Sequence, residues 1–94
     1  MSKENIMKYI INKDFDKIDN DNNKTILFTG VVENVYILNE IETKIWELFT
    51  QSCEINEAYA KFNSIEPKVS VKKEDFYDFV EQLISKRILI LSND

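Results

Sequence analysis

The sequence predicts an α+β fold in which three antiparallel strands precede three helices. β-branched and aromatic residues gather in short runs before residue 39, whereas the apolar residues after it recur at helical spacing. One Gly and one Pro among 94 residues indicate short connections, and a hydrophobic fraction of 44% is enough for a core. We therefore expect a single domain over residues 1–94, with strands within about 8–38 and helices within about 40–87.

The strands are predicted from β-prone runs that are separated by turn-forming residues. They are expected at residues 8–11, 24–29 and 35–38, with turns at 19–23 and 30–34. Phe15 and Ile18 continue the first strand as an irregular edge, and residues 88–91 form a short closing strand or a packed tail. The order of the runs favours an antiparallel meander.

The helices are predicted from their caps and their periodicity. Asn39 is a good N-cap, and Glu42 three residues later completes a capping box for a helix that ends near Gln51. Ser52 is expected to cap a shorter second helix, and a third helix follows over residues 71–87. Two basic residues in its last turn suit the helix dipole.

Composition disfavours several classes of function. A net charge of −5 disfavours binding to nucleic acid or to an anionic membrane surface, because both carry negative charge. The chain has no His, the usual general base and metal ligand, and Cys53 is its only cysteine, so no intrachain disulfide can form. We expect no catalytic residue, no metal site and no cofactor. Without a signal peptide or an apolar run longer than four residues, the expected location is cytoplasmic.

The predicted third helix has a wide apolar face. The arc is formed by Phe76, Tyr77, Phe79, Val80, Leu83 and Ile84. It spans about 160°, whereas packing on one core needs only about 100°. Phe76, Phe79 and Leu83 are predicted as core, and Tyr77 and Ile84 lie toward one flank. That flank either faces a groove or covers the sheet or the closing segment, and both alternatives remain open.

The predicted third strand is apolar on both faces. Val35 and Ile37 point one way, and Tyr36 and Leu38 point the other way. A helix, a second copy of the chain or a bound peptide could cover the second face. If the strand lies at a sheet edge, its unpaired backbone groups form a template for an added strand. The alternative is a central strand with the third helix on one side.

Two motifs around this strand carry a family resemblance. Val-Tyr-Ile-Leu-Asn-Glu at 35–40, followed by Ile-Trp-Glu-Leu at 45–48, resembles the coenzyme PQQ synthesis protein D (PqqD-like) family. Downstream, residues 54–58 resemble its acidic helix start, residues 75–83 its Asp-Val-x-x-Phe-Leu-x-x-Leu stretch, and Ile-Leu at 88–89 its closing apolar pair. The similarity covers about residues 24–91.

The chain departs from the family pattern at two places. Arg87 stands where the family commonly has Gly after the third helix, which suggests a different helix exit. Residues 41–44 replace a Thr-Gly-Ala-like segment and contain no Gly.

The resemblance implies a winged-helix-like fold and a recognition element for ribosomally synthesised, post-translationally modified peptides. The leader of a precursor peptide would add as a strand beside the third strand, with its side chains in the cleft toward the third helix. A modifying enzyme acting in trans, such as a radical maturase, a leader peptidase or a cyclase, would be the second partner. The expected peptide-binding residues are Val35, Tyr36, Ile37, Leu38, Lys72, Lys73, Phe76, Tyr77, Val80 and Ile84.

Two alternatives stay open. A winged-helix DNA-binding regulator fits the helix order, but residues 72–87 carry four basic and four acidic side chains, and a recognition helix should be basic. A self-associating structural subunit would cover the apolar third strand with a second copy. The chain is accordingly expected as a monomer or a homodimer.

Overall fold

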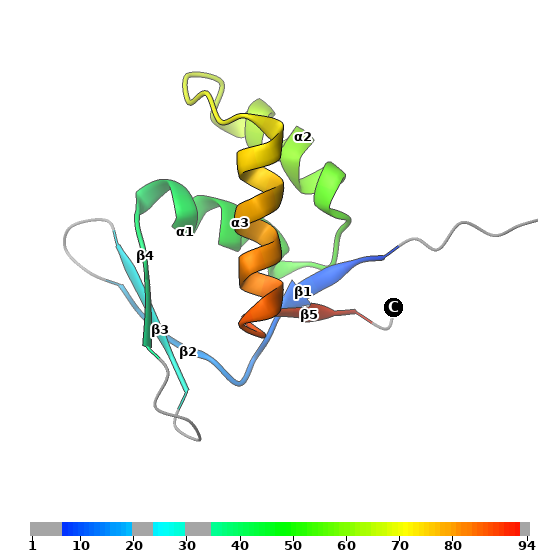
Figure 1. Ribbon diagram of the computed structural model, residues 1–94. Helices are drawn as coiled ribbons and strands as arrows, with labels where there is room; N and C mark the ends of the chain where they lie inside the picture. Colours follow the sequence, from blue (N-terminus) through cyan, green and yellow to red (C-terminus); the bar gives the residue numbers. More distant parts are fainter. Residues whose placement is uncertain (1–6, 20–23, 30–34, 93–94) are drawn as a thin grey trace, which may run out of the picture.

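The computed structural model describes residues 7–19, 24–29 and 35–92, and it shows the expected α+β fold. The elements in chain order are β1 (Tyr9–Ile11), β2 (Asp16–Asp19), β3 (Thr25–Phe28), β4 (Val35–Leu38), α1 (Glu40–Glu47), a 3₁₀ turn (Leu48–Thr50), α2 (Ile55–Ile65), α3 (Lys73–Ser85) and β5 (Leu89–Leu91). A three-stranded antiparallel sheet thus precedes three helices (Figure 1). Apart from the last residue of β2, the turns predicted at 19–23 and 30–34 lie outside the described residues.

The meander uses a different first strand from the one predicted. Its order is β2-β3-β4, whereas β1 pairs antiparallel with β5 in a separate two-stranded sheet. β2 reads Asp-Lys-Ile-Asp and holds one apolar residue, so its sequence has little β-propensity of its own. β1 is β-prone, but its partner lies about 80 residues away, and propensity says nothing about the choice of partner.

The helix starts are partly those predicted. Asn39 caps α1 in the expected capping box with Glu42. The prediction that Ser52 caps α2 is wrong, because α2 begins after Glu54. Cys53 exchanges two backbone hydrogen bonds with Tyr9, at 2.9 and 3.1 Å, which hold the chain extended there and delay the helix.

Helix α3 ends on a left-handed residue, although the position holds Arg rather than Gly. Arg87 has φ 64°, and its N–H donates to the Ile84 carbonyl at 3.0 Å. The N–H of Ile88 donates to the Leu83 carbonyl at 2.9 Å, and both of these side chains are buried. This is a Schellman ending. The expectation that Arg87 changes the helix exit is therefore wrong, because the hydrogen bonds and the buried pair hold the residue left-handed.

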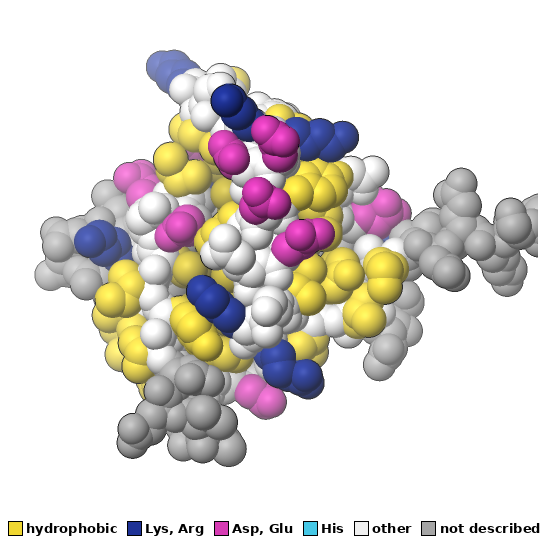
Figure 2. All heavy atoms as spheres, viewed as in Figure 1, with side chains coloured by type: hydrophobic (Ala, Val, Ile, Leu, Met, Phe, Trp, Pro, Cys, Tyr) yellow, Lys and Arg dark blue, Asp and Glu magenta, His cyan; other side chains and the backbone are white. Residues whose placement is uncertain are grey.

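The core lies where α3 passes between the two sheets. Phe76, Val80 and Leu83 are buried along the middle of α3, with the β2–β4 sheet beyond one flank and the β1–β5 pair beyond the other (Figure 1). The outward side of α3 carries a column of acidic side chains, and hydrophobic surface lies on either side of this column (Figure 2). Two neighbouring sheets, not one, explain the wide apolar arc of this helix. Within the described ranges, no helix combines the length and apolar character needed to cross a membrane.

Candidate functional site

Strand β4 lies at the end of its sheet. β3 pairs with one side of it, and among the described residues no strand and no backbone hydrogen bond occupies the other side. Alternate residues of an antiparallel strand direct both N–H and C=O to the same side, so the outer side of β4 presents backbone groups that no described strand pairs. The Leu38 carbonyl accepts a hydrogen bond from Oγ1 of Thr43 at 3.5 Å. From the sequence, the strand at residues 35–38 could have been either an edge strand or a central strand. Among the described residues, the structure shows that it is an edge strand.

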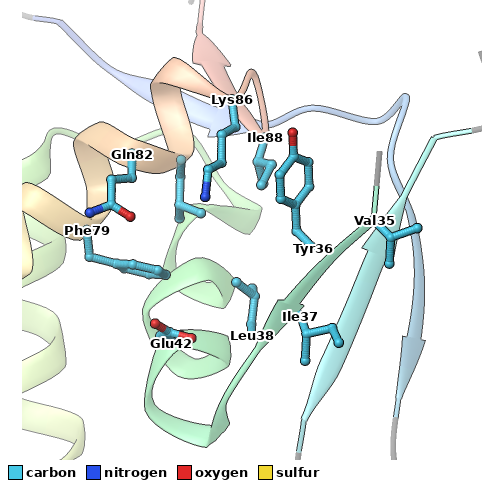
Figure 3. A pocket seen from close by; sticks show the side chains of 10 residues that line it. Val35, Tyr36, Ile37, Leu38, Glu42, Phe79, Gln82, Lys86 and Ile88 are labelled. Atoms are coloured by element: carbon cyan, nitrogen blue, oxygen red, sulfur yellow. The ribbon is translucent and has the colours of Figure 1, made fainter. Parts of the chain in front are cut away.

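A cleft of about 210 Å³ opens between β4 and the second half of α3 (Figure 3). It is lined by Val35, Tyr36, Ile37, Leu38, Glu42, Phe79, Gln82, Leu83, Lys86 and Ile88. The side chains of Leu38, Leu83 and Ile88 are almost fully buried and form its apolar floor. A closed apolar cavity of about 150 Å³ binds benzene, so the cleft has room for one large apolar side chain.

Tyr36 forms the wall at one end of the cleft. Its ring packs against the Phe15 ring with 6.0 Å between centroids. Lys86, from the C-cap of α3, places its Nζ 5.1 Å from the centre of the Tyr36 ring. A cation over an aromatic face is attracted to it, so this contact holds the ammonium group at the mouth of the cleft. Lys86 is otherwise exposed, so its remaining donors can reach a ligand.

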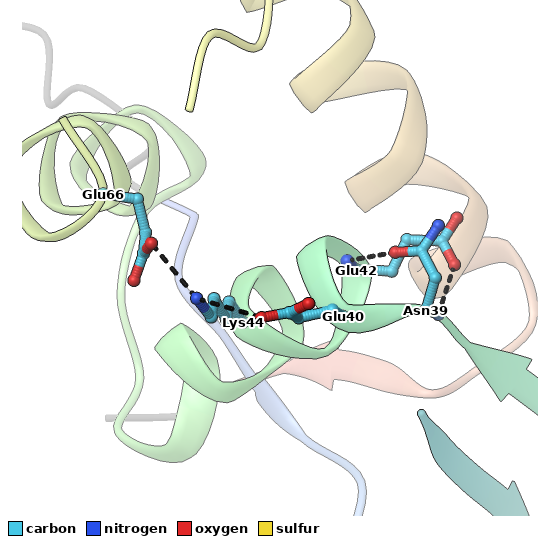
Figure 4. A network of polar contacts seen from close by, with 5 residues as sticks. All are labelled: Asn39, Glu40, Glu42, Lys44 and Glu66. Carbon is cyan, nitrogen blue, oxygen red and sulfur yellow. Dashed lines mark hydrogen bonds and ion pairs between the residues drawn. The ribbon is translucent and has the colours of Figure 1, made fainter. Parts of the chain in front are cut away.

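The opposite end of the cleft carries a carboxylate. Figure 3 shows Glu42 below Leu38, at the far end from Lys86. The capping box fixes its position, because Oε1 of Glu42 accepts from the Asn39 N–H at 2.9 Å while the Glu42 N–H donates to Oδ1 of Asn39 at 2.8 Å (Figure 4). The cleft therefore has an apolar floor, a cation at one end and an anion at the other.

A polar tie keeps α1, which carries Glu42, in place against α2. Nζ of Lys44 donates to Oε1 of Glu66 at 3.1 Å and lies 3.7 Å from Oε2 of Glu40 (Figure 4). The hydrogen bond to Glu66 raises the pKa of Lys44 and so favours its charged form. None of the three residues of this tie lines the cleft.

The strand half of the predicted site lines this cleft, and the helix half does not. All four residues of β4 border the cleft. Phe76 and Val80 have no exposed surface and belong to the core. Ile84 lies on the other flank of α3, where it lines a separate hollow with Tyr9 and β5.

The remaining predicted residues lie elsewhere on α3. Tyr77 is half-buried, and Nζ of Lys73 lies 5.6 Å from the centre of its ring. Lys72 is the N-cap of α3 and Lys73 its first residue, whereas the cleft borders the second half of the helix. The structure thus brings neither lysine to the cleft beside β4.

Six residues of the lining were missed as site residues, namely Glu42, Phe79, Gln82, Leu83, Lys86 and Ile88. Phe79, predicted as core, is half-buried at the opposite edge of the apolar arc from Tyr77. Gln82 and Lys86 follow it on the same flank. The one signal in the sequence was the width of the arc, which shows that α3 has two apolar flanks. Which flank faces β4 depends on how α3 crosses the sheet.

The one cysteine of the sequence, Cys53, lies outside the cleft and is buried. Cys53 is 3% exposed, its Sγ donates to the Leu48 carbonyl at 3.7 Å, and burial raises the pKa of its thiol. A buried thiol with a raised pKa is a poor nucleophile. In the part of the chain that the structure describes, no three Cys, Asp or Glu side chains are grouped so as to hold a metal ion.

Known proteins add no family assignment to this geometry. Neither a scan against models of known protein families nor a search of curated proteins finds a match for this chain. The resemblance to PqqD-like domains therefore depends on the pattern of residues 24–91 alone.

Proposed function

We propose that this chain is a non-catalytic recognition domain that binds the leader of a ribosomally synthesised precursor peptide. The observation that carries the proposal is the edge of β4, which no described strand pairs, beside a cleft with an apolar floor and charged ends. An edge with free N–H and C=O groups can take up an extended peptide, and a cleft next to it can take up alternate side chains of that peptide. The PqqD-like pattern at 35–48 supports the same function.

The binding mode divides into two contributions. Backbone hydrogen bonds to β4 tolerate most sequences, because every residue but Pro has the same N–H and C=O groups. Specificity comes from the side chains that point toward α3, opposite Tyr36 and Leu38. The domain itself performs no chemistry. It raises the local concentration of the precursor at a partner enzyme in the cytoplasm, for which a radical maturase, a leader peptidase or a cyclase is the expected class.

A titration with leader peptides tests this function. The probes are fluorescein-labelled synthetic leaders encoded by short open reading frames beside the gene for this chain, and the readout is anisotropy. Each leader is also made with single backbone N-methyl groups along the segment. Strand addition predicts an alternating result, because only every second N–H faces β4. Methylation then abolishes binding at alternate positions and is tolerated between them.

Two matched variants locate the site. Phe79 and Tyr77 are both half-buried aromatic residues on opposite flanks of α3. Phe79→Ala is expected to weaken binding about tenfold, the effect of losing one well-packed aromatic contact, and Tyr77→Ala to leave it unchanged. Loss of binding in Tyr77→Ala alone would move the site to the flank that the sequence predicted. Absence of binding by every leader, or a uniform effect of N-methylation, contradicts strand addition.

The outer face of the sheet favours self-association as a second candidate function. Val35 and Ile37 are 61% and 62% exposed, and the register aligns Ile37 with Ile26 and Ile18 on the same face. An exposed apolar row of this kind is typical of interaction surfaces. Sedimentation velocity of the wild type and of Ile18→Lys tests it, since only a dimer through this face dissociates in the variant. A nucleic-acid function is disfavoured, because the outward side of α3 is acidic (Figure 2).

A further inference from the structure

The two charged residues of the cleft lie at distinct positions along β4. Lys86 stands over Tyr36, and Glu42 lies below Leu38 (Figure 3). Tyr36 and Leu38 are two residues apart on one strand, so they point to the same face and their Cα atoms are separated by about 6.6–6.8 Å. A ligand reaching toward α3 therefore meets the cation and the apolar floor at two places separated by one strand repeat.

An added strand has the same spacing. Its residues directly opposite Tyr36 and Leu38 point to the same face of the sheet as these two do, and they are also two positions apart. The residue opposite Leu38 faces the floor and Phe79, where room exists for one large apolar side chain. The residue opposite Tyr36 faces the ammonium group of Lys86, which favours a carboxylate.

We propose that the cleft selects peptides carrying a large apolar residue and an Asp or Glu two positions apart, with the carboxylate at Lys86. This inference depends on the proposed strand addition and specifies the class of peptide. A carboxylate on the peptide residue opposite Leu38 would approach the carboxylate of Glu42, which the capping box holds in position. The two like charges would repel each other. The order of the two residues is therefore also selected.

The direction of the bound peptide relative to β4 determines the order of its apolar and acidic residues. The neighbouring strands of this sheet are antiparallel, and β4 runs from Val35 to Leu38. A peptide antiparallel to β4 passes Leu38 first and Tyr36 second, so its apolar residue precedes its acidic residue. The expected pattern is Leu-x-Asp, where Leu stands for any large apolar residue.

Nine-residue peptides test the pattern. In a common background of Thr, Ser and Gln, five peptides carry Leu-x-Asp, Leu-x-Asn, Leu-x-Lys, Asp-x-Leu or adjacent Leu-Asp. Their Kd values are measured by titration into ¹⁵N-labelled protein, which detects weak binding and locates it through amide shifts on β4 and α3. Leu-x-Asp is expected to bind about three- to fivefold tighter than Leu-x-Asn, the usual scale for a solvent-accessible ion pair. The difference shrinks as salt is added.

A charge reversal assigns the preference to one residue. Lys86→Glu is expected to prefer Leu-x-Lys over Leu-x-Asp. Lys73→Glu makes the same charge change on the same helix but outside the cleft lining, and it is expected to keep the wild-type preference. Equal affinity of the wild type for Leu-x-Asp and Leu-x-Asn, or a preference that survives Lys86→Glu, overturns the charge rule while strand addition stands. If none of the peptides shifts β4, the proposed function fails together with the rule.

Discussion

Arg87→Gly is expected to stabilise the fold, although it deletes a whole side chain. Arg87 has φ 64°, a conformation that costs a non-Gly residue about 1–2 kcal/mol because Cβ approaches the carbonyl oxygen. Glycine removes that cost but adds about 0.5–1 kcal/mol of backbone entropy to the unfolded chain. Taking the middle of each range, the difference is a gain of about 0.75 kcal/mol in the free energy of unfolding. For a chain of this length, that gain raises Tm by about 3–6 °C.

Two control variants isolate the backbone effect in a urea or thermal unfolding assay. Arg87→Ala loses the same charge and side chain as the Gly variant but keeps Cβ, so it should lack the gain in stability. Ser85→Gly introduces Gly two residues earlier, where the backbone is helical, and should lower stability by about 0.5 kcal/mol. The reasoning is refuted if Arg87→Gly is no more stable than Arg87→Ala, or if it destabilises the chain as Ser85→Gly does.

Two further predictions concern α1 and the buried thiol. Asn39→Ala removes the acceptor of the Glu42 N–H and should lower the free energy of unfolding by about 1 kcal/mol, whereas Asn39→Asp keeps it; equal stabilities in urea would contradict the capping role. Native Cys53 should react far more slowly with a thiol reagent than it does in denaturant, and a native rate equal to that of free cysteine would refute its burial. Because its pKa is raised in the folded chain, this thiol contributes stability below the ordinary thiol pKa that is lost as pH rises through the folded value.

Local sequence signals predicted the segment from β4 to α1 well. Strand β4 has the predicted bounds, and the capping box at Asn39 forms as expected. Both features depend on residues that are close in the sequence. The side chains of residues 35–38 favour extended backbone, and the side-chain oxygen of Asn39 accepts from the N–H of Glu42, three residues later. Long-range pairing overrode local signals elsewhere, as Cys53 shows by staying extended against Tyr9 and shifting the start of α2.

The candidate site could be predicted only in part, for a geometric reason. The apolar character of β4 pointed to this strand, and the width of the apolar arc on α3 showed that the helix packs on more than one side. Choosing between Phe79 and Tyr77 requires the crossing direction of α3 over the sheet. That direction depends on the pairing of β1 with β5, which places a second sheet on the Ile84 flank.

The sequence by itself determined the fold class, the helices, the strand that borders the cleft and the negative net charge. These properties follow from composition, periodicity and hydrogen bonds between near neighbours, all of which act within a few residues. The tertiary structure alone decided that β4 is an edge among the described strands, that Phe79 rather than Tyr77 faces it, and that Lys86 and Glu42 stand at opposite ends of one cleft. Those relations join residues up to about 50 positions apart, and they arise from packing α3 between two sheets, which no local pattern encodes.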